Sequence, residues 1–410
     1  MISGTAPCGV RYAVRRGGNA VAYCALSIGC GTRDEEGFPQ GTAHFTEHNI
    51  FRGTSRKSAS VIGSYLDRLG GELNAYTTKE EIVIHATVLK EDLGKAARLL
   101  FELATDSVFP ENEIETERGV VLDEIISYKD NPAEDVYDRF EALLFDGHPL
   151  GKPILGTSAS VKKIGREHLL RFVSERFTPE RMALTIVANL PEKDMEKRVL
   201  RLLAKQFPGI EKPRESTQRP LSKPSAPQFN KTIDKHHHEA NAVIGSYAPS
   251  LYEIPERLCA AMLANILGGP ASNSLLNREL RERHGWVYGI ECSYTQYADT
   301  GIMAITFGCD RPNLNSCLKA IDKILRQLRE EPLSAGRLKS FRKQLLGQLA
   351  ISAEAGEAQC LSMGKSLLSW GRIAPREEVI GALEAITAEM LRDMAVRIFA
   401  PETVSTLLYL

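Results

Sequence analysis

A proline-rich stretch near the middle of the chain most constrains its fold. Prolines fix φ and remove backbone donors, which favours extended chain over helix or sheet. Five of them fall within residues 207–232, at Pro208, Pro213, Pro220, Pro224 and Pro227. Each of the two remaining parts of the 410-residue chain is long enough to form a domain of its own. We therefore expect a domain over 1–207, a linker over 208–232 and a second domain over 233–410.

Both parts alternate between strand and helix patterns in a similar order. The first part predicts strands at 20–28, 81–88 and 182–188, with helices at 42–51, 59–69 and 192–206 and throughout 90–177. The second predicts strands at 241–247, 288–294 and 302–307, with helices at 255–267, 273–284 and 313–399. Residues 111–125 also superpose without gaps on 335–349, which indicates either an internal duplication or two unrelated amphipathic helices.

Charge and composition exclude several classes of partner. The chain has 51 Lys and Arg against 52 Asp and Glu, so no basic excess favours nucleic acid. The longest apolar run, 259–267, is about half of the ~20 residues that a membrane span needs. The first twenty residues lack the apolar core of a secretory signal, and the eight cysteines show no CxxC spacing. We therefore expect a cytoplasmic protein with reduced, structural cysteines that binds neither nucleic acid nor membrane.

The segment HFTEH places chemistry on one turn of a predicted helix. His44 and His48 are four residues apart, about 40° around the helix and ~6 Å along it, so both imidazoles can reach one ion. Glu47 lies beside them and can take a proton from water near the ion. This HxxEH order is the inverted form of the zinc peptidase motif. The alternative is a surface helix with two solvated histidines, and a third ligand must decide between them.

Four segments in the first half carry a resemblance to a known family. They are GTAHFTEHNIFRGT, GGELNAYTTKEE, ETERGVVLDEI and HPLGKPILGT. In this order and spacing they resemble the pitrilysin/insulinase family, which includes mitochondrial processing peptidases and bacterial two-domain relatives. The resemblance implies two α+β domains, each a mostly antiparallel sheet packed with helices, which together form half of a clamshell.

The resemblance also implies roles for particular residues. The family's third zinc ligand falls on Glu124, so His44, His48 and Glu124 would bind one Zn²⁺ per chain, with Glu47 as the general base. Glu117 matches an acid that orients a ligand, although a solvated helix charge is the alternative. Asn74, Ala75, Tyr76 and Thr77 match a peptide-binding sheet edge, or else form a turn. Arg281 and Tyr288 of LRERHGWVY match substrate and oxyanion contacts, or else are a surface arginine and a core tyrosine.

The second domain should lack zinc ligands. The offset that superposes the two helices sets Gln348 opposite Glu124, and sets Gly268 and Ser272 opposite the two histidines. The resemblance thus predicts a zinc metalloendopeptidase that hydrolyses peptides or small unfolded polypeptides. We expect a homodimer, or a heterodimer with a related subunit. The alternative function is a non-catalytic or partner-dependent subunit of a heterodimeric peptidase or peptide-binding assembly.

Overall fold

The computed structural model describes residues 1–410 except 19, 211–218 and 220. It divides into two compact units, each assembled from three segments of the chain. Unit 1 comprises Met1–Ile125, Lys152–Arg219 and Ala350–Ala374, and unit 2 comprises Ile126–Gly151, Pro220–Leu349 and Pro375–Leu410. Part of the predicted linker over 208–232 lies outside the described residues.

Unit 1 is built on a six-stranded sheet with the order β1-β2-β6-β3-β5-β4. Neighbouring strands are antiparallel except β2 and β6, which run parallel. All seven residues of β6 are buried, as expected for a central strand covered on both faces. The strands are β1 (Ile2–Thr5), β2 (Arg11–Arg16), β3 (Val21–Ile28), β4 (Glu72–Thr77), β5 (Ile82–Leu89) and β6 (Met182–Ala188).

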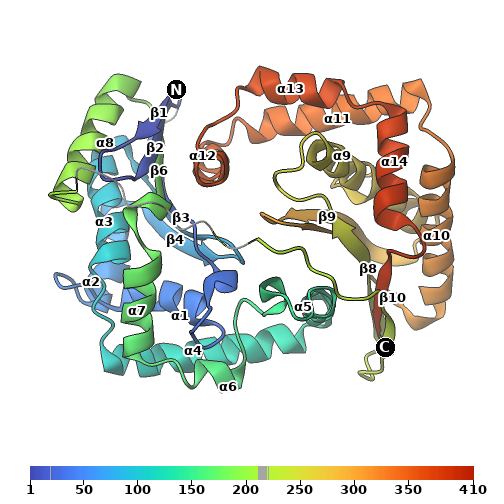
Figure 1. Cartoon of the computed structure of the whole chain (residues 1–410), viewed down its shortest axis with the longest axis horizontal. Helices are drawn as coiled ribbons and strands as arrows, with labels where there is room; N and C mark the ends of the chain where they lie inside the picture. The colour runs from blue at the N-terminus through green and yellow to red at the C-terminus, as the bar shows by residue number, and fades with distance from the viewer. Residues whose placement is uncertain (19, 211–218, 220) are drawn as a thin grey trace. The chain divides into compact units, whose positions relative to one another are not determined.

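Helices cover both faces of this sheet (Figure 1). One face packs against α3, and alternate residues of β3 and β6 on the other face pack against α12. On α12, Cys360, Met363 and Leu367 are the buried contacts. The helices of unit 1 are α1 (Thr42–Asn49), α2 (Ala59–Gly63), α3 (Leu93–Thr105), α4 (Glu111–Asp130), α6 (Ser158–Val161), α7 (Arg166–Arg176), α8 (Glu192–Gln206) and α12 (Gly356–Trp370). The part of α4 up to Ile125 belongs to unit 1, and the rest of this helix belongs to unit 2.

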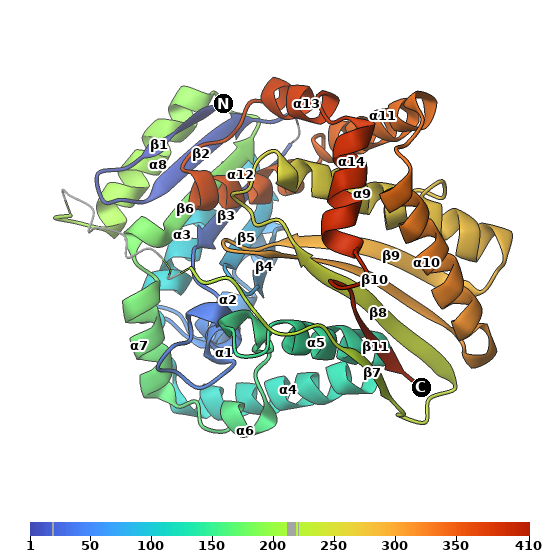
Figure 2. The ribbon, with the colours of Figure 1, turned by 45° about the vertical axis from the view of Figure 1, so that its right-hand side comes forward.

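Unit 2 is built on a five-stranded sheet with the order β7-β11-β8-β10-β9, parallel only between β7 and β11. Its long strands lie beside α9, α10 and α14 (Figure 2), and α5 packs on the opposite face. The strands are β7 (Asn230–Ile233), β8 (Glu239–Ala248), β9 (Val287–Gln296), β10 (Gly301–Asp310) and β11 (Ser405–Tyr409). The helices are α5 (Pro132–Leu144), α9 (Glu256–Gly268), the π-helical turn η7 (Asn277–Arg283), α10 (Leu314–Glu330), α11 (Ala335–Ser352), α13 (Arg376–Glu384) and α14 (Ala388–Phe399).

The predicted fold class, α+β with two mostly antiparallel sheets, is confirmed. The strand at 182–188 and the helix at 192–206 have the predicted bounds, and α4 and α11 begin where the superposed segments begin. The prediction missed β1, β2, β7 and β11. These strands are short, and β2 carries three arginines, so their patterns are too brief or too polar to stand out from coil.

The compact units differ from two contiguous halves of the sequence. Helix α12 packs on β3 and β6 of unit 1, and α5 packs on β8 and β11 of unit 2. The reason is that each sheet buries apolar residues on both faces, so each requires a covering helix on its second face. Helical periodicity shows that α5 and α12 have an apolar side, but it does not show which sheet that side covers.

Two further expectations concern cysteines and membranes. All eight cysteines are free and buried, in agreement with a structural role. Within the residues that the structure describes, no helix combines the length and apolar character that crossing a bilayer demands.

Candidate metal centre

The start of α1 is fixed by a buried carboxylate and a glycine. The two carboxylate oxygens of Glu35 accept hydrogen bonds from the Gly41 and Ala43 amides, at 2.9 and 2.8 Å. Gly41 has a φ of 86°, and a Cβ there would lie 2.7 Å from the Leu155 carbonyl oxygen, so only glycine fits. Burial raises the pKa of Glu35 to about 8. These contacts set the position of the helix that carries the HFTEH segment.

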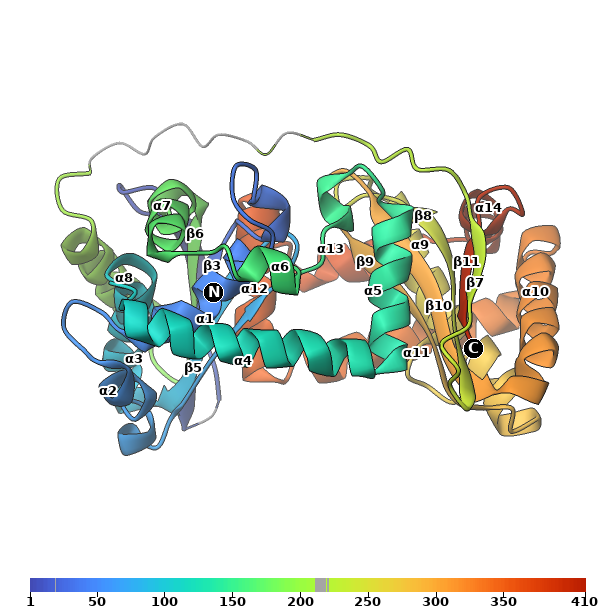
Figure 3. The ribbon, with the colours of Figure 1, turned by 90° about the horizontal axis from the view of Figure 1, so that it is seen from below.

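Three side chains predicted as ligands lie together, two from α1 and one from α4. The two helices run side by side (Figures 1 and 3). Glu124 Oε2 is 3.7 Å from His44 Nε2 and 3.6 Å from His48 Nε2. One ligand atom from each of the three side chains lies within 4.8 Å of the others. Across the described residues this is the one such group of three His, Cys, Asp or Glu side chains. Two imidazoles and one carboxylate are the His₂Glu donor set of catalytic zinc sites.

Burial and hydrogen bonding show that a cation fits this cluster. Glu124 Oε2 is buried and has no hydrogen-bond partner among the described residues, although it faces both imidazole Nε2 atoms. An unsatisfied buried acceptor is costly, and a divalent cation between these atoms would satisfy it. Burial, with a smaller contribution from His48, lowers the pKa of His44 to about 3. His44 is therefore neutral at physiological pH, as a metal ligand must be.

Glu117 connects His48 to the guanidinium of Arg52. Its Oε1 lies 2.8 Å from His48 Nδ1, and its Oε2 forms an ion pair with Arg52. Burial opposes the charged form of Glu117, but its bonds to His48 and Arg52 outweigh burial and lower its pKa. Burial lowers the pKa of His48, but the hydrogen bond to Glu117 and the nearby charges of Glu117, Glu47 and Glu124 together outweigh burial, so the net shift is upward. Because Glu117 is 2% exposed, the alternative of a solvated helix charge is wrong.

Glu47 lies beside the cluster and is held by a hydroxyl. It is 8% exposed, and its Oε2 accepts a hydrogen bond of 2.9 Å from Thr77 Oγ1. Burial raises the pKa of Glu47, while Thr77 and His48 lower it in part. The result is a carboxylate with a raised pKa next to a candidate metal site, a combination typical of functional sites.

The segment Asn74–Thr77 belongs to β4, so the alternative reading as a turn is wrong. Strand β4 ends the sheet and pairs only with β5 among the described strands. Its outer edge therefore has backbone groups available for another strand. The Thr77 bond to Glu47 connects this edge to the cluster.

Arg281 and Tyr288 lie in unit 2, whereas the cluster lies in unit 1. Arg281 is an exposed residue of η7, and Tyr288 is 71% exposed near the start of β9. The alternative of a core tyrosine is therefore wrong, and both side chains are available to a ligand. Gln348, predicted opposite Glu124, accepts a 2.8 Å hydrogen bond from Asn265.

Sequence reasoning missed two residues that organise the site. Arg52 follows His48 by four residues, and this spacing could have indicated that both face α4. Glu35 carries no comparable signal, because its partners are backbone amides of a turn.

The fold and the site together define a class: two-unit α+β proteins that carry an inverted HxxEH metal motif. A family model described as "Insulinase (Peptidase family M16)" matches residues 12–158, and one described as "Peptidase M16 inactive domain" matches 163–345. "Uncharacterized zinc protease YmxG" of Bacillus subtilis is 30% identical over 92% of this chain and 90% of its own length. An "Uncharacterized zinc protease" of Rickettsia bellii is 29% identical over 92% of this chain and 90% of its own length.

Solved structures agree on the fold. A protease from Helicobacter pylori has a TM-score of 0.89 at 18% identity and covers 100% of this chain and 99% of its own. A peptidase M16 inactive domain from Pseudomonas fluorescens has a TM-score of 0.88 at 16% identity and covers 100% of this chain and 97% of its own. The chain therefore belongs to peptidase family M16, the insulinase family, which confirms the resemblance seen in the sequence.

Proposed function

We propose that this chain is a zinc metalloendopeptidase that hydrolyses peptides or small unfolded polypeptides. The observation that carries the proposal is the convergence of His44, His48 and Glu124 with the Glu47 carboxylate beside them. Two imidazoles and one carboxylate suit Zn²⁺ as the metal. The relatives named as zinc proteases support the same metal and the same kind of reaction.

The residues divide the chemistry between them. Bound zinc would supply a Lewis acid that makes water more acidic and polarises a peptide carbonyl. Glu47 takes a proton from the attacking water on its carboxylate and then gives a proton to the nitrogen of the leaving amine. Thr77 holds one oxygen of that carboxylate in place, and Glu117 fixes the orientation of the His48 ring.

The substrate would bind as an added strand. We propose that an extended peptide pairs with residues 74–77 on the outer edge of β4, which brings its scissile bond toward Glu47. Backbone pairing is common to all peptides, so sequence specificity should be loose. A reducing compartment such as the cytoplasm suits a chain whose eight cysteines are all free.

The proposal includes a dimer in which unit 2 of a second copy helps bind the substrate. Arg281 would hold the substrate and Tyr288 would donate to the developing oxyanion. Mixing Glu47→Gln chains with Tyr288→Phe chains tests this arrangement, because each variant alone should be nearly inactive. Recovered cleavage in the mixture supports contribution from the second copy, and an inactive mixture contradicts it.

The main experiment is Glu47→Gln in the full chain, assayed with a quenched fluorescent peptide and by measurement of bound zinc. The exchange preserves shape and removes the proton-accepting charge. We expect zinc to be retained and kcat to fall by about 10²–10⁴-fold. The exposed Glu36→Gln is the matched control and should be unchanged.

Two results would contradict the proposal. Full cleavage by zinc-loaded Glu47→Gln would show that another group moves the proton. A parent chain that binds zinc but cleaves no peptide alone would favour the alternative, a subunit that depends on a different partner. The isolated chain is therefore sufficient to distinguish a peptidase that is active by itself from a subunit that depends on a different partner.

A further inference from the structure

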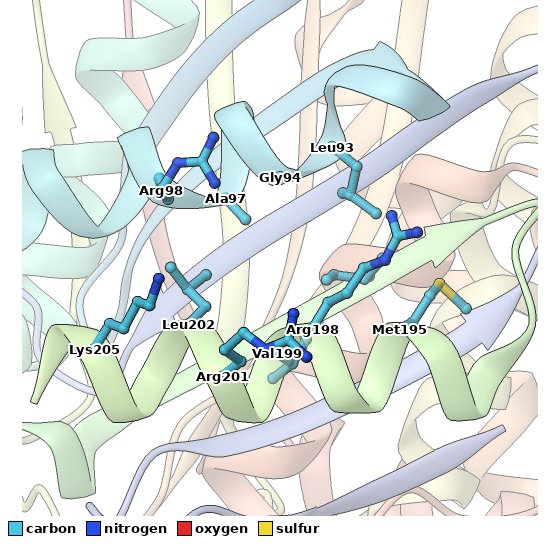
Figure 4. A pocket seen from close by; sticks show the side chains of 11 residues that line it. Leu93, Gly94, Ala97, Arg98, Met195, Arg198, Val199, Arg201, Leu202 and Lys205 are labelled. Atoms are coloured by element: carbon cyan, nitrogen blue, oxygen red, sulfur yellow. The ribbon is translucent and has the colours of Figure 1, made fainter.

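A cavity between α3 and α8 lies on the sheet face opposite α12. Its volume is about 310 Å³, near the lower limit of ~300 Å³ for small-molecule sites. The floor is apolar and comes from three elements, with buried Leu93 and Ala97 from α3, Ile186 from β6, and Met195 and Val199 from α8. Figure 4 shows that Leu202 and Arg198 extend from α8 toward α3.

The rim of this cavity carries four positive charges and no negative one. Arg198, Arg201 and Lys205 follow one another at i, i+3 and i+7 on α8, so they share a helix face, and Arg98 lines the cavity from α3. All four are exposed, and within the described residues none of them forms an ion pair or a side-chain hydrogen bond. No Asp or Glu lines the cavity.

Three acids near the cavity are bound to other groups. Asp92 pairs with Lys95 at 2.7 Å, and Glu102 pairs with Lys57 at 2.5 Å. Glu196 accepts a 2.8 Å hydrogen bond from a tyrosine of β2. The four rim cations therefore lack carboxylates of their own, and their charge is available to a ligand.

We propose that this cavity binds a small amphipathic anion, namely a medium-chain carboxylate. The carboxylate would lie among the three cations of α8 and Arg98, and the alkyl tail would cover the apolar floor. A purely polar anion would leave that floor exposed, and a neutral apolar ligand would leave the cations without partners. The cavity is small, which favours a short tail over a long one. This site is separate from the metal cluster, and its existence does not depend on peptidase activity.

Isothermal titration calorimetry of the full chain with decanoate tests the proposal. We expect saturable binding to the parent, and binding at least tenfold weaker in the double variant Arg198→Glu/Arg201→Glu. Both positions are exposed, so folding should be preserved, as circular dichroism would verify. The matched control is Lys193→Glu/Lys197→Glu, which makes the same charge change on exposed residues of α8 that do not line the cavity. It should bind decanoate like the parent.

Three further probes separate charge from tail. Decylammonium, with a tail of similar length and the opposite charge, should bind at least tenfold more weakly than decanoate. Hexanoate should bind more weakly because it covers less of the floor, and inorganic phosphate should not displace decanoate. The proposal is overturned if the parent does not bind decanoate, if both double variants bind it equally, or if phosphate or an acidic peptide displaces it at equal concentration.

Discussion

Replacing Glu117 by Gln should weaken zinc binding without removing any ligand. Glu117 lies 2.8 Å from His48 Nδ1 and pairs with Arg52, while its side chain is 3% exposed. The exchange keeps the shape of the side chain and an acceptor for the imidazole N–H. It removes the negative charge that makes His48 a better donor to the metal, and it leaves the Arg52 cation beside a neutral amide.

The expected size follows from these contacts. Loss of a group that orients a metal-binding histidine typically reduces affinity by 10–100-fold, or about 1.4–2.8 kcal/mol. Glu117 also raises the pKa of His48, so the variant should have a lower His48 pKa. Protons should then compete with zinc at a lower pH than in the parent. Affinity should therefore be compared at a pH well above the His48 pKa, where this competition does not mask the loss.

The measurement is zinc affinity by competition with a chromophoric chelator across pH. Glu115→Gln is the matched control on the same helix, because its side chain is 70% exposed and its ion pair among the described residues is with Arg118. We expect Glu115→Gln to bind zinc like the parent. Unchanged affinity in Glu117→Gln, with no shift in the pH of zinc release, would refute an orienting role for Glu117.

Three other changes give predictions of known sign. Thr77→Val removes a hydrogen bond that lowers the pKa of Glu47, so the acidic limb of the kcat/KM profile should move to higher pH. Burial raises the pKa of Glu35 to about 8. The contribution of Glu35 to the free energy of unfolding is therefore fully present below its unfolded pKa. It is lost as pH rises toward 8, by up to about 1.4 kcal/mol per pH unit. Glu35→Gln should flatten this slope in urea denaturation. Met363→Ala on α12 should cost about 2–5 kcal/mol of unfolding free energy.

The parts of the site predictable from sequence are the local ones. His44, Glu47 and His48 share one short helix, so their spacing alone places them together. Glu124 is far along the chain, and only the family's spacing pointed to it. Thr77 was expected to contact substrate, and its bond to Glu47 could not be predicted because it depends on the register of β4 beside α1.

The fold shows the same division between local pattern and long-range packing. The bounds of β6 and α8 follow from runs of residues that read clearly by themselves. The packing of α12 against unit 1 depends on contacts such as Cys360 with Thr185, which are 175 residues apart. An amphipathic pattern indicates which residues of a helix are buried, but it does not indicate which other element covers them. The packing partner of α12 therefore came from the structure.

Three glutamates in the site differ in what surrounds them, and this difference supports the tasks proposed for them. Glu117 has Arg52 and His48 as partners, which keep it ionised and suited to orient a ring. Glu124 has an oxygen without a hydrogen-bond partner between two imidazole nitrogens, and burial raises its pKa, so a cation would hold it ionised. Among the described residues Glu47 has the Thr77 hydroxyl as its hydrogen-bond partner, and its pKa is raised, which supports the proposal that it exchanges the proton.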